Sequence, residues 1–162
     1  MERILIGDLG AHIGKEVSIS GWVDVARNQG KMAFFDFRDR SGKVQGVVFG
    51  KPEVLEIAQT LKQEWVVKIN GTVNQRPEKM VRAEVQNGDI ELEVNAIEVL
   101  SEAESLPFDM DADLNLDTLL DYRPLTLRRS RERAIFKIQA SILNAYRMAL
   151  VRQGFTEFRA PA

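Results

Sequence analysis

The chain has 162 residues, of which 44% are hydrophobic and 28% charged, and a formal net charge of −2; these values are ordinary for a globular domain and argue against a general nucleic-acid clamp. The absence of cysteine excludes a disulfide scaffold, a thiol nucleophile and a cysteine-based zinc site. No apolar run has membrane-spanning length and Glu2, Arg3 and Asp8 interrupt the first ten residues, so we expect a cytoplasmic protein that is neither exported nor membrane-bound.

The first two-thirds of the chain are typical of short strands. Apolar and polar residues alternate in several runs, and most runs end at turn residues such as Asn28-Gln29-Gly30. After Pro52, apolar residues recur at helical spacing, which predicts a helix near 52–61. The predicted strands are 17–26, 31–39, 43–49, 65–75 and 90–100, and the first has Val17, Ile19, Gly21, Val23 and Val25 on one face.

Three strands, a helix and two further strands follow the order of a five-stranded Greek-key barrel, the OB-fold. A β-sandwich is the alternative, but it usually has about seven strands and no central helix. We therefore expect a mainly β fold: an OB-fold domain at 1–104, an acidic linker or hinge at 105–129, and a C-terminal part at 130–162. In that last part, a long apolar stripe ending before Gly154 predicts an α-helix, and 155–161 resembles a strand.

Charge is divided unevenly along the chain. Residues 83–122 hold 12 Asp and Glu with no Lys or Arg, whereas 123–162 hold nine Lys and Arg against two Glu. Either the basic parts alone meet a polyanion, or the acidic stretch is a solvated linker beside a basic helix. The aspartates at 109, 111 and 113 copy the start of a calcium loop, but Leu114 and Leu120 replace its required Gly and Glu, so we expect no metal site.

No catalytic constellation is present in the sequence. His12 is the only histidine, no phosphate-binding glycine loop occurs, and no spacing pairs two carboxylates for acid–base chemistry. The chain is therefore expected to bind a partner rather than to transform one.

Phe34 is the strongest candidate for binding. Alternation in 31–39 puts its ring on the polar face of the second strand, where burial alone does not select an aromatic residue. An exposed ring on the binding strands of an OB-fold is a platform for an unstacked base, although Phe34 could instead belong to a small second core under a loop. Arg27, Gln45 and Arg76 are expected near it, as groups that contact RNA bases or phosphates.

Four stretches of sequence resemble one known family when taken together. They are Gly-Trp-Val at 21–23, Phe-Phe-Asp-Phe-Arg-Asp-Arg-Ser-Gly at 34–42, Leu-Asp-Tyr-Arg-Pro-Leu-Thr-Leu-Arg-Arg at 120–129 and Gly-Phe-Thr-Glu-Phe-Arg-Ala-Pro at 154–161. The first two resemble the N-terminal anticodon-binding domain of aspartyl-tRNA synthetases and of the related asparaginyl enzymes. The third resembles the start of that family's catalytic domain. The helix near 135–138 and the fourth stretch resemble motif 1 of class II synthetases, with Pro161 as the dimer-interface proline.

The resemblance implies a tRNA partner, bound through its anticodon stem-loop. Phe34 matches the ring that stacks on the middle uracil of the anticodon, and Gln45 matches the glutamine that recognises the same region. Arg27 matches a contact to the backbone and anticodon loop, and Arg76 matches an arginine near the first anticodon base. Asn28, Met80 and Arg82 depart from the family pattern, so the resemblance leaves discrimination of the third anticodon base open.

The resemblance also implies what the whole parent protein does. Motifs 2 and 3, which bind ATP and activate the amino acid in this family, are absent from the sequence. The parent is expected to be a homodimeric aspartate-tRNA ligase that uses ATP and Mg²⁺, and this chain alone is expected to be inactive and to hold no cofactor. The alternatives are an asparaginyl or dual-specificity enzyme, a free-standing single-strand-binding OB protein, and a structural or dimerising module.

Overall fold

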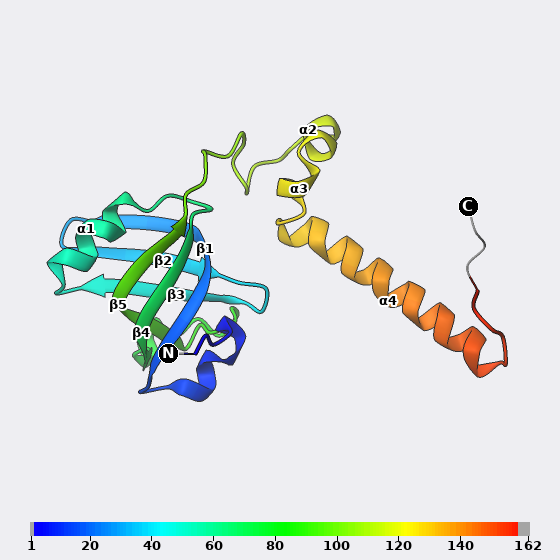
Figure 1. Ribbon diagram of the computed structural model, residues 1–162, viewed down its shortest axis with the longest axis horizontal. Helices are drawn as coiled ribbons and strands as arrows, with labels where there is room; N and C mark the ends of the chain where they lie inside the picture. Colours follow the sequence, from blue (N-terminus) through cyan, green and yellow to red (C-terminus); the bar gives the residue numbers. More distant parts are fainter. Residues whose placement is uncertain (1, 159–162) are drawn as a thin grey trace. The chain divides into compact units, whose positions relative to one another are not determined.

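A computed structural model describes residues 2–158, which form two compact units divided between Ser105 and Leu106. The first unit is a closed barrel with strand order β1-β2-β3-β5-β4 (Figure 1). Neighbouring strands are antiparallel except for the parallel pair β3 and β5. The strands are β1 (Glu16–Gln29), β2 (Met32–Arg38), β3 (Lys43–Phe49), β4 (Val66–Gln75) and β5 (Ile90–Ser101).

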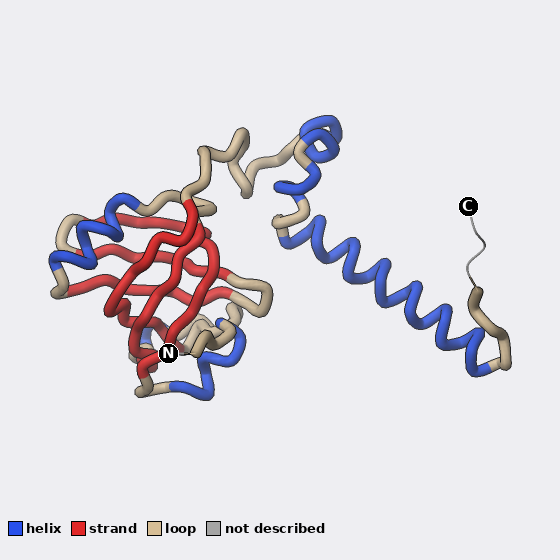
Figure 2. The backbone as a smooth tube through the Cα atoms, viewed as in Figure 1, coloured by secondary structure: helices blue, strands red, loops and turns tan. Residues whose placement is uncertain are grey.

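Helix α1 (Pro52–Thr60) connects β3 to β4 and packs against β2, β3 and β5 (Figure 2). Two short 3₁₀ helices, η1 (Ile6–His12) and η2 (Glu78–Met80), complete the unit. The order of three strands, a helix and two strands is that of the OB-fold, so the fold class predicted from the sequence is confirmed.

Alternation along each strand fills the barrel interior with apolar side chains. In β2, Ala33, Phe35 and Phe37 are at most 1% exposed, and the last two rings stack at a centroid distance of 5.5 Å. Gly46 of β3 makes room for this arrangement, because a Cβ atom there would collide with the Phe37 ring. Phe34 alternates with these residues and is half-buried on the outside of the barrel.

A β-bulge in β1 reverses which side chains face inward. The register shifts between Val23, which pairs with Phe37, and Val25, which pairs with Asp36. Val23 is fully buried, but Val25 is 38% exposed, so the prediction that Val25 shares the buried face is wrong. Because one extra residue stands opposite β2, Arg27 beyond the bulge pairs with outward-facing Phe34.

The β1–β2 hairpin is tighter than the sequence suggested. β1 continues to Gln29, which pairs with Met32, so only Gly30 and Lys31 form the turn. Gly30 has a φ of 65°, the conformation that the first residue of a type II′ hairpin turn requires. The turn therefore lies at 30–31 and not at 28–30 as predicted, because a two-residue loop of this type matches the twist of the two strands.

The second unit is helical. Its elements are α2 (Leu116–Asp121), α3 (Arg123–Thr126) and the long helix α4 (Ser130–Arg152). The acidic stretch predicted as a linker at 105–129 contains helix α2, where the Asn115 side chain accepts a hydrogen bond from Thr118 N at 2.8 Å and begins a helical turn.

The strand predicted at 155–161 does not form within 155–158, which have no regular secondary structure and no pairing strand. Pro161 lies outside the described residues.

Candidate nucleic-acid interface

The outward-facing side chains of β1, β2 and β3 form one surface, here called the outer face. Phe34 is at its centre, because β2 lies between the other two strands. Arg27 is its register partner on β1, and Val47 is its partner on β3. The outer face is defined here as Val25, Arg27, Gln29, Met32, Phe34, Asp36, Gln45, Val47 and Phe49.

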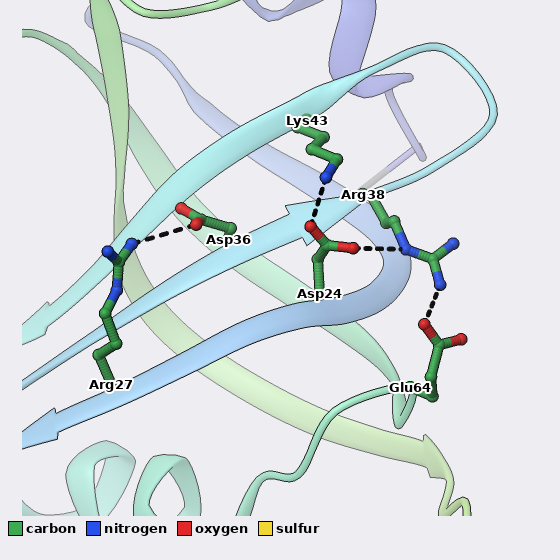
Figure 3. A network of polar contacts seen from close by, with 6 residues as sticks. All are labelled: Asp24, Arg27, Asp36, Arg38, Lys43 and Glu64. Atoms are coloured by element: carbon green, nitrogen blue, oxygen red, sulfur yellow. Dashed lines mark hydrogen bonds and ion pairs between the residues drawn. The ribbon is translucent and has the colours of Figure 1, made fainter. Parts of the chain in front are cut away.

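Arg27 is oriented by a carboxylate of the neighbouring strand. Its Nη2 donates to Asp36 Oδ2 at 3.1 Å, and the Arg27 side chain remains 46% exposed (Figure 3). Asp36 lies two residues from Phe34 on the same side of β2. The ion pair therefore holds the guanidinium against β2, the strand that carries Phe34, and leaves much of the Arg27 side chain accessible.

Gln45 is held in a similar way from the other side. It is the register partner of Asp36, and its Oε1 accepts a hydrogen bond from Arg76 Nη2 at 2.6 Å. Arg76 follows the last residue of β4, and only 6% of its side chain is exposed. Its Nε lies 3.9 Å from Glu91 Oε2 and lacks a hydrogen-bond partner among the described residues.

The Arg76 contact fixes which end of the Gln45 amide faces outward. Arginine has only donors, so it can bond only the oxygen of the amide. The amide nitrogen of Gln45, with two N–H groups, then has no partner within residues 2–158. The outer face thus presents a ring, a guanidinium and a pair of amide donors, the combination that binds an unstacked base.

A second polar network lies at the other end of the same strands. Asp24, at the bulge, accepts hydrogen bonds from both Lys43 and Arg38, and Arg38 is also bonded to buried Glu64 (Figure 3). The Arg38 guanidinium lies 5.4 Å from the centroid of the Trp22 ring. Sequence reasoning missed this network, because nothing local indicates that Glu64, beyond α1, reaches β2.

The four candidate residues thus come together in the structure. Arg27, Phe34 and Gln45 lie on adjacent strands of the outer face, and Arg76 contacts the face through Gln45. Elsewhere, His12 Nδ1 lies 3.1 Å from the Asp8 carbonyl oxygen of its own 3₁₀ helix. Across the described part of the chain, no three His, Asp or Glu side chains are gathered to hold a metal ion, and no helix is long and apolar enough to cross a membrane.

Comparisons with known proteins agree with the barrel fold. Residues 17–100 match the sequence model of a family described as OB-fold nucleic acid binding domain. An aspartate–tRNA(Asp/Asn) ligase from Corynebacterium jeikeium is 39% identical over 155 residues, which are 93% of this chain and 26% of that protein. This chain therefore spans about a quarter of the length of that relative.

Solved structures resemble the chain over nearly all of its length. An aspartyl-tRNA synthetase from Entamoeba histolytica has a TM-score of 0.87 and 25% identity, over 99% of this chain and 39% of that one. An asparaginyl-tRNA synthetase from Pyrococcus horikoshii, complexed with asparaginyl-adenylate, has a TM-score of 0.84 and 29% identity, over 99% of this chain and 37% of that one.

Proposed function

We propose that the outer face of this chain reads the anticodon of a tRNA. The chain belongs to the OB-fold nucleic acid binding family, as the anticodon-binding domain of aspartyl- and asparaginyl-tRNA synthetases. The observation that carries the proposal is the half-buried Phe34 ring on β2, the strand between Arg27 of β1 and Gln45 of β3, which Arg76 holds. An aromatic ring among donors on this face of the barrel suits an unstacked base.

Each side chain has a distinct part in this proposal. Phe34 stacks on the middle base of the anticodon, a contact worth about 1–3 kcal/mol. Arg27 donates to phosphate or to a base edge with the donors that Asp36 leaves accessible. Gln45 donates its amide N–H groups to base carbonyl oxygens, which uracil carries on its Watson–Crick edge. Arg76 is a positioning residue that fixes the Gln45 amide.

The whole protein, we further propose, is an aspartate-tRNA ligase that uses ATP. Support comes from relatives such as the aspartate–tRNA(Asp/Asn) ligase, although this chain spans only 26% of that relative's length. The name of that relative also supports a dual-specificity enzyme, and the structural likeness to an asparaginyl-tRNA synthetase supports asparagine as the alternative. The described residues do not fit ATP and Mg²⁺: they contain no glycine-rich phosphate loop and no metal-binding carboxylate cluster.

A homodimer is part of the same proposal. Helix α4 exposes a row of apolar side chains that needs a covering surface, and its sequence resembles the dimer-forming motif 1. Among them, Ile138, Ile142 and Tyr146 are 61–64% exposed. Sedimentation of the whole protein across a concentration series measures this association.

The experiment that tests the proposed function is a titration of anticodon stem-loop RNA. A fluorescently labelled stem-loop with the aspartate anticodon is titrated with wild type and with Phe34→Ala, and the dissociation constant is read from fluorescence anisotropy. Loss of one stacked base predicts weaker binding by about 5- to 150-fold. Leu100→Ala is the matched control, since Leu100 is a 49% exposed residue of β5 that is not part of the outer face.

A second RNA separates decoding from general single-strand binding. A stem-loop with the same stem and a scrambled loop is expected to bind more weakly than the cognate loop. Equal affinity for both loops would support a generic single-strand-binding barrel instead. Binding by Phe34→Ala at the wild-type level would contradict both readings.

A further inference from the structure

A large apolar side chain at the end of β3 is part of neither the core nor the proposed anticodon contacts. Phe49 is the last residue of β3 and 62% of it is exposed, whereas its neighbour Val48 is fully buried. The alternation of β3 puts Phe49 on the same side as Gln45 and Val47. The ring of Phe49 is therefore on the outer face, at its hairpin end.

Phe49 continues the surface that Phe34 begins. Its register partner on β2 is Met32, which lies two residues from Phe34 on the same side of that strand. Side chains two residues apart on a strand are about 6.6 Å apart, and cross-strand partners are closer still. Phe34, Val47, Met32 and Phe49 thus make one continuous apolar area.

The Phe49 ring is open to solvent, and polar residues stand in and beside the hairpin turn at the edge of this apolar area. Helix α1 is tied to the hairpin turn, where Gln59 Nε2 donates to the Gly30 carbonyl at 3.3 Å, yet it leaves most of the Phe49 ring uncovered. Lys31 in the same turn is exposed, and Gln29 flanks Met32 from β1. An exposed ring in a region that also holds a cation and an amide has the chemistry of a stacking site beside a phosphate backbone.

We propose that Phe49, supported by Met32, is a second stacking platform, which takes the base of the nucleotide next to the one on Phe34. The inference rests on the proposed function, because it extends the same outer face. The ligand is single-stranded RNA with at least two consecutive unstacked bases. Phe49 contributes affinity without choosing the base, since stacking on an aromatic ring tolerates every base.

The test compares variants of the full 162-residue chain in the stem-loop titration. Phe49→Leu keeps an apolar side chain but removes the ring, and is expected to weaken binding by about 5- to 150-fold. Phe49→Trp restores a flat ring and is expected to bind at least as tightly as wild type. Leu100→Ala is again the control, and thermal unfolding of each variant checks that the barrel is intact.

A base-specific readout locates the platform. Stem-loops with 2-aminopurine at one loop position each report stacking as quenched fluorescence. Phe34→Ala is expected to relieve quenching at one position and Phe49→Leu at an adjacent position. If Phe34→Ala weakens binding but Phe49→Leu binds and quenches like wild type, the second platform is wrong and the proposed function stands. If wild type does not bind the stem-loop, the proposed function itself fails.

Discussion

At the residue scale, the outward chemistry of Gln45 depends on a side chain that is almost entirely buried. Arg76 holds the Gln45 oxygen at 2.6 Å and has no acceptor capacity of its own. Removing the Gln45 side chain takes an acceptor from a buried guanidinium, and removing Arg76 leaves the orientation of the Gln45 amide unfixed. Two different replacements at position 45 separate the effect on RNA binding from the effect on stability.

Gln45→Glu is expected to keep the contact to Arg76 and to lose the two outward N–H donors. RNA binding should weaken more than in Gln45→Ala, because the carboxylate also repels phosphate. The free energy of unfolding should be higher in Gln45→Glu than in Gln45→Ala, which leaves Arg76 without an acceptor. Anisotropy titration and urea unfolding measure the two effects, and wild-type affinity in Gln45→Glu would exclude donation by Gln45.

The Asp39 carboxylate accepts four hydrogen bonds from residues that the structure describes. Burial alone raises the pKa of Asp39, but hydrogen bonds from the Ser41 hydroxyl and from the backbone N–H groups of Ile6, Ser41 and Gly42 outweigh it, so the pKa is lowered below 3.8. The bond from Ile6 N, at 3.0 Å, joins the N-terminal 3₁₀ helix to the β2–β3 turn. The charged form of Asp39 thus stabilises a contact between segments distant in sequence.

A carboxylate whose pKa is lowered in the folded state stabilises that state fully when the pH is above the group's unfolded-state pKa. This stabilisation is lost as the pH falls through the folded-state pKa. We therefore expect Asp39→Asn to lower the free energy of unfolding by about 1.5–3 kcal/mol at pH 7, with a difference from wild type that shrinks below pH 3.8. Urea unfolding across pH measures it. Exposed Asp113→Asn is the control, and a pH-independent difference would assign the effect to shape rather than charge.

At the scale of elements, the bulge in β1 decides which residues the outer face contains. Without the bulge, strict alternation would make Val25 and Arg27 face inward, as Val17 to Val23 do. The extra residue at Asp24 reverses the series, so Arg27 pairs with Phe34 outside the barrel. The same bulge places Asp24 where Lys43 and Arg38 both reach it.

The barrel interior constrains the β3 strand as tightly as the bulge constrains β1. A methyl group on Gly46 would meet the Phe37 ring and, at 3.2 Å, Val94 Cγ2. Gly46→Ala is expected to lower the free energy of unfolding by about 1–3 kcal/mol through overpacking. Gly10→Ala, which meets nothing within 4 Å, is the matched control. Equal urea midpoints for the two variants would contradict this account of the core.

At the scale of the whole molecule, the two units differ in how they bury apolar surface. The buried apolar residues of the described chain all lie between Ile6 and Ile97, within the barrel unit. In the helical unit, Arg123 packs over the Phe136 ring at 5.1 Å, but most of the apolar side chains of α4 are exposed. The barrel unit therefore has the core that independent folding requires.

Residues 1–105 alone are expected to unfold cooperatively and to bind the anticodon stem-loop with the dissociation constant of the full chain. All residues of the outer face and Arg76 belong to that unit. Urea unfolding followed by circular dichroism and the anisotropy titration test the two statements. Substantially weaker binding by the shortened chain would mean that residues 106–162 contribute to RNA contact.

The order of strands and helix and the outward position of Phe34 could be predicted from the amino-acid pattern, because alternation and turn residues act over a few neighbours. Positions at strand ends and side-chain chemistry also predicted Arg27, Gln45 and Arg76 near Phe34, and the resemblance to a synthetase family implied a role for each. Three facts became visible only in the folded chain: a bulge turns Arg27 outward, Arg76 is buried against Gln45, and Phe49 extends the face. These facts depend on register and on contacts between residues far apart in the chain, and local periodicity contains no information about either.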